Sequence, residues 1–302
     1  MQNLQDQVAL VIGGGRGIGR ALSHELAAQG AAVVVDDLYK DENGSASELV
    51  AEEIRKAGGR ALALNLDCTT AEGGEEMVAC TIAEFGKLDI LIPCAGNFPK
   101  GALHEVGDDA WDLTQRLHVR GTYIPVRAAL PHMRERNYGR ILMIASRGAF
   151  MQMPPSKEVP RDEGAIRAGQ NVAYSAAKAA LLGFANSLAF ETWETGITVN
   201  ALIPSATTQL FPGTAPRKVG GIPVSISLDP SYIAPTVAFL CSPAAGNLSG
   251  KIVYASGGDV LVFSDPLNLA GSRMLRKDGR WTHEELENSL LPLLGIPLVE
   301  NA

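Results

Sequence analysis

The chain has 302 residues, of which 46% are hydrophobic, and its formal net charge at pH 7 is −7. This length and composition predict a globular protein with a packed core, built as one large α/β domain or two small ones. The acidic balance and the lack of a basic cluster argue against nucleic acid as the main partner and favour a small-molecule substrate. No apolar run is long enough to span a bilayer, so no membrane partner is expected.

The ends of the sequence and its cysteines bear on the cellular compartment. Residues 1–7 run at once into a short apolar segment without a basic stretch, so we expect no secretion signal, and the last three residues are not a peroxisomal address. The cysteines are scattered without metal-binding spacing, which predicts reduced thiols in a cytoplasmic protein with neither zinc nor disulfides. They are Cys68, Cys80, Cys94 and Cys241.

The first predicted elements form a β-strand, a glycine-rich loop and a helix. Val8–Ile12 is a continuous apolar run, typical of a parallel strand that is covered on both faces, and a helix is expected over residues 20–29. Glycines let the loop between them approach a pyrophosphate, and the amides at the helix start favour its negative charge. The loop residues expected to bind a dinucleotide are Gly13, Arg16, Gly17, Ile18 and Gly19.

The second predicted strand, residues 32–35, ends in Asp36 and Asp37. A carboxylate at this position can accept hydrogen bonds from the adenosine ribose and repels a 2′-phosphate, which predicts NAD rather than NADP. We expect Asp37 to make that contact. Arg16 argues in the other direction, because its guanidinium could reach a 2′-phosphate.

The middle of the chain continues the alternation of helices and strands. We expect a helix over 48–57, strands over 61–66 and 88–92, and a long helix over 110–136 that Pro125 and Pro131 interrupt. The alternation predicts a doubly wound parallel sheet, Rossmann-like, in the α/β class.

The candidate catalytic residues follow in the second half. A strand over 139–146 brings Ser146 to the carboxyl edge of the sheet, where open α/β folds bind ligands. Tyr174 and Lys178 are four residues apart on a predicted helix and therefore share one face. An adjacent cation favours the phenolate, so this pair can bring a tyrosine toward useful acid/base behaviour.

The pattern Gly-x-x-x-Gly-x-Gly followed by Tyr-x-x-x-Lys resembles the short-chain dehydrogenase/reductase family over residues 5 to about 260. Within it, the chain is similar to the 3-hydroxyacyl-CoA dehydrogenase domain of the type 2 multifunctional enzyme. That likeness rests on residues 35–38, 118–122 and 174–187 and on the C-terminal tail.

The resemblance implies roles for the catalytic residues. Ser146 would orient the substrate oxygen and Tyr174 would exchange the proton. Lys178 would lower the pKa of Tyr174 and hold the nicotinamide ribose, while hydride passes between cofactor and substrate. His118 stands where the family has an asparagine that serves a proton relay, and either a relay or plain packing is open for it.

The resemblance also implies further cofactor contacts. Asp67 would contact the adenine, with capping of the next helix as an equal alternative. Ala95 and Gly96 match the family's Asn-Asn-Ala-Gly, whereas Pro93 and Cys94 depart from it, so that strand must be supported differently. Thr207 is expected near the nicotinamide carboxamide.

The remaining segments are expected to shape the substrate site. We expect residues 147–170 to form an exposed polar loop. Met151 and Met153 could line an apolar pocket there or simply lie on the surface. Residues 208–228 suit a mobile lid, and a helix over 229–241 and a strand over 248–254 follow. We expect one domain over 1–263 and an extension over 264–302 that covers this domain or a neighbouring subunit.

The sequence as a whole predicts an NAD-dependent dehydrogenase of a bulky apolar secondary alcohol, such as a 3-hydroxyacyl-CoA or a hydroxysteroid, forming a homodimer or homotetramer. A terpenoid or cyclic alcohol is an alternative substrate. The alternatives of another class are an epimerase or dehydratase that retains NAD and a non-catalytic nucleotide-binding protein.

Overall fold

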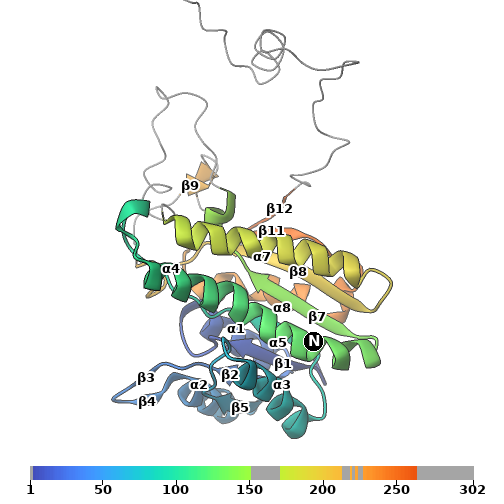
Figure 1. The fold of residues 1–302 in the computed structure, drawn as a ribbon. Coiled ribbons are helices and arrows are strands. Elements are labelled where there is room, and N and C mark those ends of the chain that lie inside the picture. Colours follow the sequence, from blue (N-terminus) through green and yellow to red (C-terminus); the bar gives the residue numbers. More distant parts are fainter. Residues whose placement is uncertain (1–2, 151–170, 213–217, 220–221, 224–226, 264–302) are drawn as a thin grey trace, which may run out of the picture. The chain divides into compact units, whose positions relative to one another are not determined.

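The computed structural model describes residues 3–150, 171–212, 218–219, 222–223 and 227–263. Eight strands form one sheet in the order β12-β11-β8-β7-β6-β1-β2-β5 (Figure 1). Their bounds are β1 (Val8–Ile12), β2 (Ala32–Asp36), β5 (Arg60–Leu64), β6 (Ile90–Pro93), β7 (Gly139–Ile144), β8 (Ile197–Pro204), β11 (Ile252–Ser256) and β12 (Asp259–Val262).

The strand order reverses beside β1, from which the chain winds first to β2 and β5 and then back to β6, β7, β8 and β11. All of these neighbours pair in parallel, and β12 alone pairs antiparallel, on β11. The predicted doubly wound, Rossmann-like sheet is therefore confirmed. The antiparallel edge strand β12 was not expected from the sequence.

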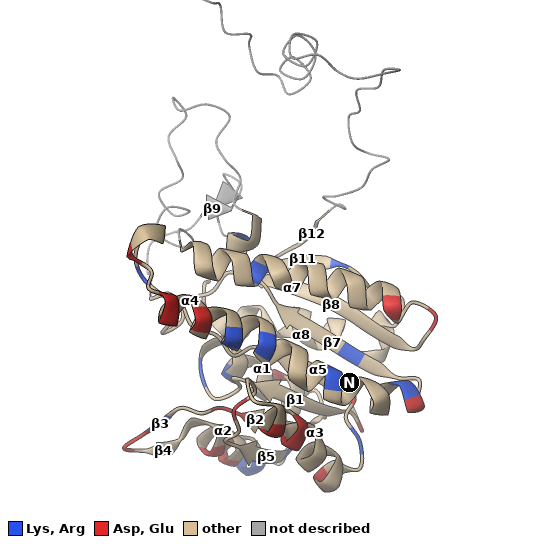
Figure 2. Ribbon diagram, viewed as in Figure 1, with Lys and Arg blue, Asp and Glu red and all other residues tan. Residues whose placement is uncertain are grey.

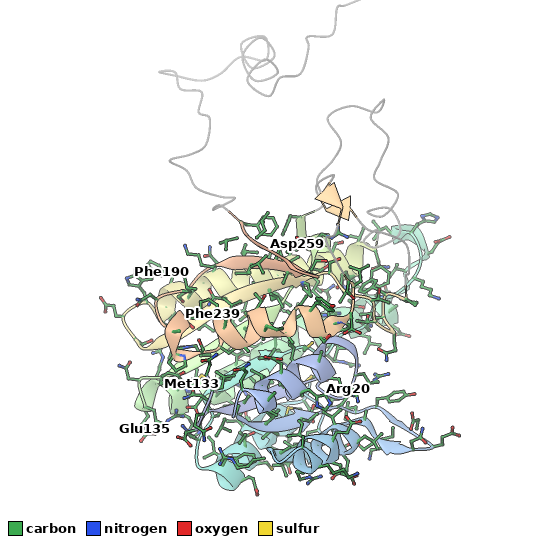
Figure 3. All side chains as sticks on the ribbon, turned by 180° about the vertical axis from the view of Figure 1, so that it is seen from behind. Arg20, Met133, Glu135, Phe190, Phe239 and Asp259 are labelled. Atoms are coloured by element: carbon green, nitrogen blue, oxygen red, sulfur yellow. The ribbon has the colours of Figure 1, made fainter. Side chains whose placement is uncertain are left out.

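Helices cover both faces of the sheet (Figures 1 and 3). On one face α3 (Ala71–Phe85) packs on α5 (Gly121–Glu135), and α4 (Asp108–Gln115) packs on α7 (Val172–Glu191). On the other face α1 (Gly17–Ala28) contacts both α2 (Ala46–Lys56) and α8 (Ala234–Leu240). Strands β1, β2, β6 and β7 are buried along their whole length, as strands covered on both faces must be.

Several boundaries differ from the sequence-based expectations. Helix α1 starts inside the glycine loop, at Gly17 rather than Arg20. The helix expected over 229–241 is a short 3₁₀ turn, Pro230–Tyr232, followed by α8. The structure also contains two small antiparallel pairs, β3 (Lys40–Asp41) with β4 (Gly44–Ser45) and β9 (Lys218–Val219) with β10 (Ile222–Pro223).

The long helix expected over 110–136 is divided, but not at its prolines. Pro125 and Pro131 both lie inside α5, whereas the regular hydrogen-bond pattern changes earlier, in the π-helical turn η2 (Arg116–Arg120). Single π turns inside helices often occur at functional positions. This one carries His118.

The remaining short 3₁₀ turns in the described residues are η1 (Leu103–Glu105), η3 (Arg147–Phe150) and η5 (Pro243–Ala245).

No helix among the described residues is both long and apolar enough to cross a bilayer. Of the loop expected over 147–170, residues 151–170 lie outside the described residues, as does the extension expected over 264–302. Parts of the lid expected over 208–228, at 213–217, 220–221 and 224–226, lie outside them too. The roles given to them, and the domain boundary at 263, stay predictions.

Candidate functional site

The glycine loop is held against the end of β2 by its own backbone. The amides of Gly13 and Gly14 both donate to the Asp36 carbonyl, at 2.7 and 2.8 Å. Gly13 has a positive φ of 76°, and a Cβ on Gly19 would lie 2.0 Å from the Gly13 carbonyl oxygen. The loop and the first turn of α1 are thus in contact at a distance that only glycine permits.

The start of α1 lacks a side-chain cap. Its N-cap residue, Arg16, makes no side-chain capping hydrogen bond, so the first amides of the helix are not satisfied by a cap. The Gly19 amide faces the Cys94 thiol, while the uncapped first turn and the positive end of the helix dipole suit a phosphate. The loop residues predicted to bind the dinucleotide therefore lie together at the start of this helix, and their contact with a pyrophosphate stays a prediction.

Asp37 lies beside this loop, as predicted. One of its oxygens, Oδ2, accepts from the Gly15 amide at 3.1 Å, and Oδ1 accepts from the Tyr39 amide at 2.9 Å. The Arg16 guanidinium stacks on the Tyr39 ring, 3.7 Å from its centroid. The backbone fixes the carboxylate, and the arginine that argued for NADP is engaged with an aromatic face.

Asp36 is a titratable group that the sequence did not single out. Its side chain is buried and Oδ1 accepts from the Leu66 amide at 2.9 Å. Burial raises the pKa of Asp36 to about 7, against the effect of that hydrogen bond, and the nearby charges of Asp37 and Asp67 raise it further.

Asp67 does not cap the following helix. Thr70 is the N-cap of α3, since its side chain accepts from the Gly73 amide at 3.0 Å. Asp67 instead forms a turn just before the helix, accepting from the Thr69 amide at 2.8 Å. The capping alternative is therefore wrong, and the adenine contact stays a proposal.

Helix α7 presents Tyr174 and Lys178 from its first turns. Asn171 caps the helix by accepting from the Tyr174 amide at 3.1 Å, which fixes where the helix begins. The Lys178 Nζ donates to the Ile144 carbonyl at 2.6 Å and lies 5.6 Å from the centroid of the Tyr174 ring. The predicted pair therefore shares one face of the helix, toward the end of β7.

Ser146 follows β7 by two residues and meets Tyr174. Its hydroxyl is hydrogen-bonded to the Tyr174 phenol, and its Oγ also accepts from the Gly148 amide at 3.1 Å. The structure thus brings together Ser146, Tyr174 and Lys178, which the sequence placed in two separate segments.

Burial controls the protonation of the two α7 residues. It raises the pKa of Tyr174 to about 12, and the hydrogen bond with Ser146 opposes this only in part. Burial likewise lowers the pKa of Lys178 to about 8. The net pKa shift of Tyr174 is therefore upward, opposite to the expected lowering by Lys178, because desolvation of the phenolate dominates.

His118 is buried at the π turn beside Tyr174, with their ring centroids 5.4 Å apart. Its Nε2 lies 3.0 Å from the Asn97 carbonyl oxygen and 3.2 Å from the Asn97 amide. Its Nδ1 is buried without a hydrogen-bond partner among the described residues. Burial and the charge of Lys178 lower the pKa of His118 to about 3, so the ring is neutral at physiological pH.

The altered segment Pro93-Cys94-Ala95-Gly96 fits closely between the glycine loop and His118. Pro93 ends β6 opposite Ile12, and the Cys94 amide donates to the Ile12 carbonyl at 2.8 Å. Ala95 lies against Gly13, where a Cβ would come within 2.7 Å of Ala95 atoms, and a Cβ on Gly96 would meet the His118 ring at 2.5 Å. Close packing and strand pairing support this segment.

Thr207 lies after β8, but its amide is already used. That amide donates to the Leu228 carbonyl at 2.7 Å. A nicotinamide carboxamide could accept from the Thr207 amide only by displacing the Leu228 carbonyl. Thr207 as a carboxamide contact stays a proposal.

The sequence-based prediction did not identify two aromatic residues near the site. The rings of Phe98 and Phe211 both contact the Tyr174 ring edge-on, with centroids 5.0 and 6.1 Å away. Neither residue belongs to a regular element or a motif, so no periodicity in the sequence could have indicated them.

The arrangement combines a candidate dinucleotide cradle with a candidate acid/base group. The close contacts of the glycines, the uncapped start of α1 and Asp37 fit the pyrophosphate and ribose of a nicotinamide cofactor. At the same edge of the sheet, Tyr174 and Ser146 present hydroxyls to one place. No cluster of metal-ligating side chains occurs in the described ranges, and all four cysteines there are free thiols.

Comparison with known sequences agrees with this site. A family model described as "Enoyl-(Acyl carrier protein) reductase" matches residues 13–259. A short-chain type dehydrogenase/reductase of Mycobacterium tuberculosis is 35% identical over 265 residues, covering 85% of this chain and 84% of that protein. The mouse peroxisomal multifunctional enzyme type 2 is 34% identical over 256 residues, covering 83% of this chain but 32% of the mouse enzyme. This chain thus spans about a third of the length of the mouse relative.

Solved structures give the same result. A short chain dehydrogenase from Mycobacterium avium superposes with a TM-score of 0.81 at 27% identity, over 98% of both chains. A short chain dehydrogenase from Burkholderia cenocepacia, in complex with NADP, has a TM-score of 0.69 at 29% identity and covers 85% of this chain and 98% of its own. With the glycine loop and the Ser146, Tyr174 and Lys178 geometry, these matches confirm the resemblance: the chain belongs to the short-chain dehydrogenase/reductase family of oxidoreductases.

Proposed function

We propose that this chain transfers hydride between NAD(H) and a secondary alcohol or ketone. The observation that carries the proposal is the convergence of Ser146, Tyr174 and Lys178 beside the glycine loop. The cofactor, when bound, supplies the hydride chemistry. The protein positions the substrate and moves the proton.

The chain's own part in the reaction is a proton transfer at the Tyr174 hydroxyl. With its pKa at about 12, the phenol holds its proton at neutral pH and can donate it to the oxygen of a ketone. Ser146, hydrogen-bonded to the same phenol, orients that oxygen. In the oxidative direction the Tyr174 phenolate accepts the proton of the substrate alcohol. The Lys178 ammonium, which is charged below about pH 8, stabilises that phenolate.

The preference for NAD is proposed from Asp37. Both of its oxygens are held by backbone amides in a buried position, so a 2′-phosphate would meet a fixed negative charge. The NADP complex of the Burkholderia relative shows that a related chain binds the other cofactor.

Equilibrium titration of both cofactors against the wild type and Asp37→Ala tests this preference for NAD. We expect NAD to bind at least tenfold more tightly, and this preference to be lost in the variant. Tighter binding of NADP by the wild type would contradict the proposal.

The proposed substrate is bulky and apolar. A 3-hydroxyacyl-CoA leads because of the similarity to the multifunctional enzyme, a hydroxysteroid is next, and a terpenoid or cyclic alcohol is the alternative. A screen of NAD reduction over these four classes would rank them by kcat/KM.

The variant Tyr174→Phe tests the acid/base assignment. It removes one hydroxyl, and we expect kcat to fall by about 10² to 10⁴ while NAD binding persists. Retained turnover would contradict the assignment. An epimerase or dehydratase would convert substrate without net NAD reduction, and a non-catalytic binder would bind NAD and convert nothing.

We also propose that His118 serves the proton relay through its unpartnered Nδ1. A neutral imidazole can accept on one nitrogen and donate from the other. His118→Asn restores the family's usual side chain and should keep turnover, whereas His118→Phe should lower kcat about tenfold and change its pH profile. If both variants keep the wild-type pH profile, His118 only holds Asn97 in place.

Location and assembly are proposals as well. We propose a cytoplasmic homodimer or homotetramer that assembles through the α5 and α7 region, as the family resemblance implies. Light scattering coupled to size-exclusion chromatography measures the assembly directly, and a monomer at micromolar concentration would contradict it.

A further inference from the structure

Three aromatic rings from separate parts of the chain meet at the catalytic edge of the sheet. Phe98 and Phe211 are 5.0 Å apart between centroids, with ring planes at 64°. Each also contacts the Tyr174 ring edge-on, at 5.0 and 6.1 Å with interplanar angles of 70° and 68°. The rings form a triangle with one corner at the proposed proton donor.

Both phenylalanines are held in place by their surroundings. Phe98 follows Asn97, whose backbone contacts the buried His118 ring. Phe211 closes a turn in which its amide donates to the Thr208 carbonyl at 3.1 Å, and the Thr208 amide donates back to the Phe211 carbonyl at 3.3 Å. The turn therefore presents Phe211 in a defined position.

The same turn also reaches the cofactor loop. A Cβ on Gly17 would lie 3.3 Å from the Thr208 side chain and 3.4 Å from that of Gln209. One short segment thus touches the proposed pyrophosphate cradle at Thr208 and the proposed proton donor at Phe211. Both rings are partly exposed, so a group packed against their open sides would lie close to the Tyr174 ring.

We infer that Phe98 and Phe211 are specificity-determining residues that select substrates carrying an apolar ring next to the reacting carbon. This inference rests on the proposed hydride-transfer function and narrows its substrate class: a 3-hydroxyacyl-CoA then qualifies only if its C3 carries an apolar ring rather than an alkyl chain. Aromatic rings pack best edge-to-face or offset, so a wall of two rings at a steep angle favours a third flat ring over a small alkyl group. A rigid ring also loses less conformational entropy on binding than a flexible chain.

The test replaces the two rings without leaving large cavities. Phe98→Leu, Phe211→Leu and the double variant keep apolar volume but remove the aromatic faces. Phe239→Leu is the matched control, because Phe239 is 51% exposed on α8, outside the proposed assembly surface, where Figure 3 labels it. The probes are acetophenone and 2-butanone, two methyl ketones that differ in the group beside the carbonyl.

The measured quantities are kcat/KM for reduction of each ketone and the Kd of each ketone for the enzyme–NADH complex. We expect the wild type and the control to favour acetophenone at least tenfold. The double variant should lower that ratio roughly tenfold, as the loss of two aromatic contacts implies. The NADH Kd should stay within about twofold, since neither ring belongs to the cofactor cradle.

The outcomes separate this inference from the function on which it rests. An unchanged ratio in a double variant that still binds NADH and reduces ketones would overturn the inference and leave the proposed function intact. Ketone binding without turnover would count against hydride transfer, while the Kd ratio would still decide the role of the rings. If neither ketone binds the NADH complex, the inference is wrong.

Discussion

The two ends of the proposed site, the cofactor cradle and the catalytic edge, are built in different ways. The cradle consists of residues 13–19 and Asp36 and Asp37, joined by short backbone hydrogen bonds and glycine contacts. The catalytic edge takes Phe98, His118, Ser146, Tyr174 and Phe211 from segments spread over more than a hundred residues. The first depends on local chain geometry and the second on the whole fold.

Charge differs between the two ends as well. Three aspartates, Asp36, Asp37 and Asp67, gather at the cradle. By contrast, Lys178 and Glu191 are the only charged residues of α7, a helix that is mostly tan in Figure 2. At both ends burial shifts titratable groups toward their neutral forms, with pKa values of about 7 for Asp36, 12 for Tyr174, 8 for Lys178 and 3 for His118. Low local dielectric is thus a property of the site as a whole.

The largest effect is expected at the catalytic edge, from Lys178→Met. This variant removes the buried cation beside Tyr174, and we expect kcat to fall by about 10² to 10⁴. The free energy of unfolding at pH 7 should not fall, because a buried charge whose pKa is lowered to about 8 costs stability wherever it is protonated. Steady-state kinetics measure the fall in kcat, and urea unfolding measures the free energy of unfolding. A large loss of stability would show that Lys178 holds the fold rather than the chemistry.

At the cradle, Gly19→Ala should be the most damaging small change. Its Cβ would lie 2.0 Å from the Gly13 carbonyl oxygen, a backbone atom, so the loop must move. We expect a loss of about 3 kcal/mol or more in unfolding free energy, at or above the upper end of overpacking costs. NAD binding should weaken with it. Urea unfolding and NAD titration measure the two, and wild-type values for both would show that the contact is not restrictive.

Asp36→Asn should change the pH dependence of stability. Asp36 holds its proton more tightly in the folded chain, with a pKa of about 7 against the ordinary value of 3.8. The resulting stabilisation is present below about pH 4 and is lost as pH rises through about 7, so the cofactor-free wild type should lose on the order of 2 kcal/mol between pH 5 and 7.5. The variant, which can still accept from the Leu66 amide, should lose less. Equal pH slopes for the two proteins would contradict the assignment.

Gly183→Ala is the matched control for Gly19→Ala and has the smallest expected effect. Gly183 lies within α7, and a Cβ there would meet no atom within 4 Å. The higher helix propensity of alanine should raise the free energy of unfolding by about 0.5 to 1 kcal/mol, without changing kcat. If this variant were as unstable as Gly19→Ala, helix backbone effects rather than loop contact would explain both.

The sequence was most informative where function depends on local geometry. The strand, glycine loop and helix at residues 8–28, the acidic end of β2 and the four-residue spacing of Tyr174 and Lys178 can all be predicted, because their periodicities and glycines act over a few residues. The doubly wound sheet followed from the alternation of elements, although its antiparallel edge strand did not.

Other features depended on contacts between distant segments. Pro125 and Pro131 indicated an interrupted helix, yet the irregular turn formed at residues 116–120. Thr70 rather than Asp67 capped α3. The pKa of Tyr174 rises because the fold buries it beneath Phe98 and Phe211, which carry no sequence signal.

By itself, then, the sequence determined the family pattern, the order of the elements and the chemical groups of the proposed reaction. Only the tertiary structure decided how strongly burial shifts their pKa values, where His118 lies and which rings surround Tyr174. The reason is physical: backbone conformation and helix faces are set by neighbours in the chain, whereas desolvation and side-chain packing are set by whatever the fold brings within a few ångströms.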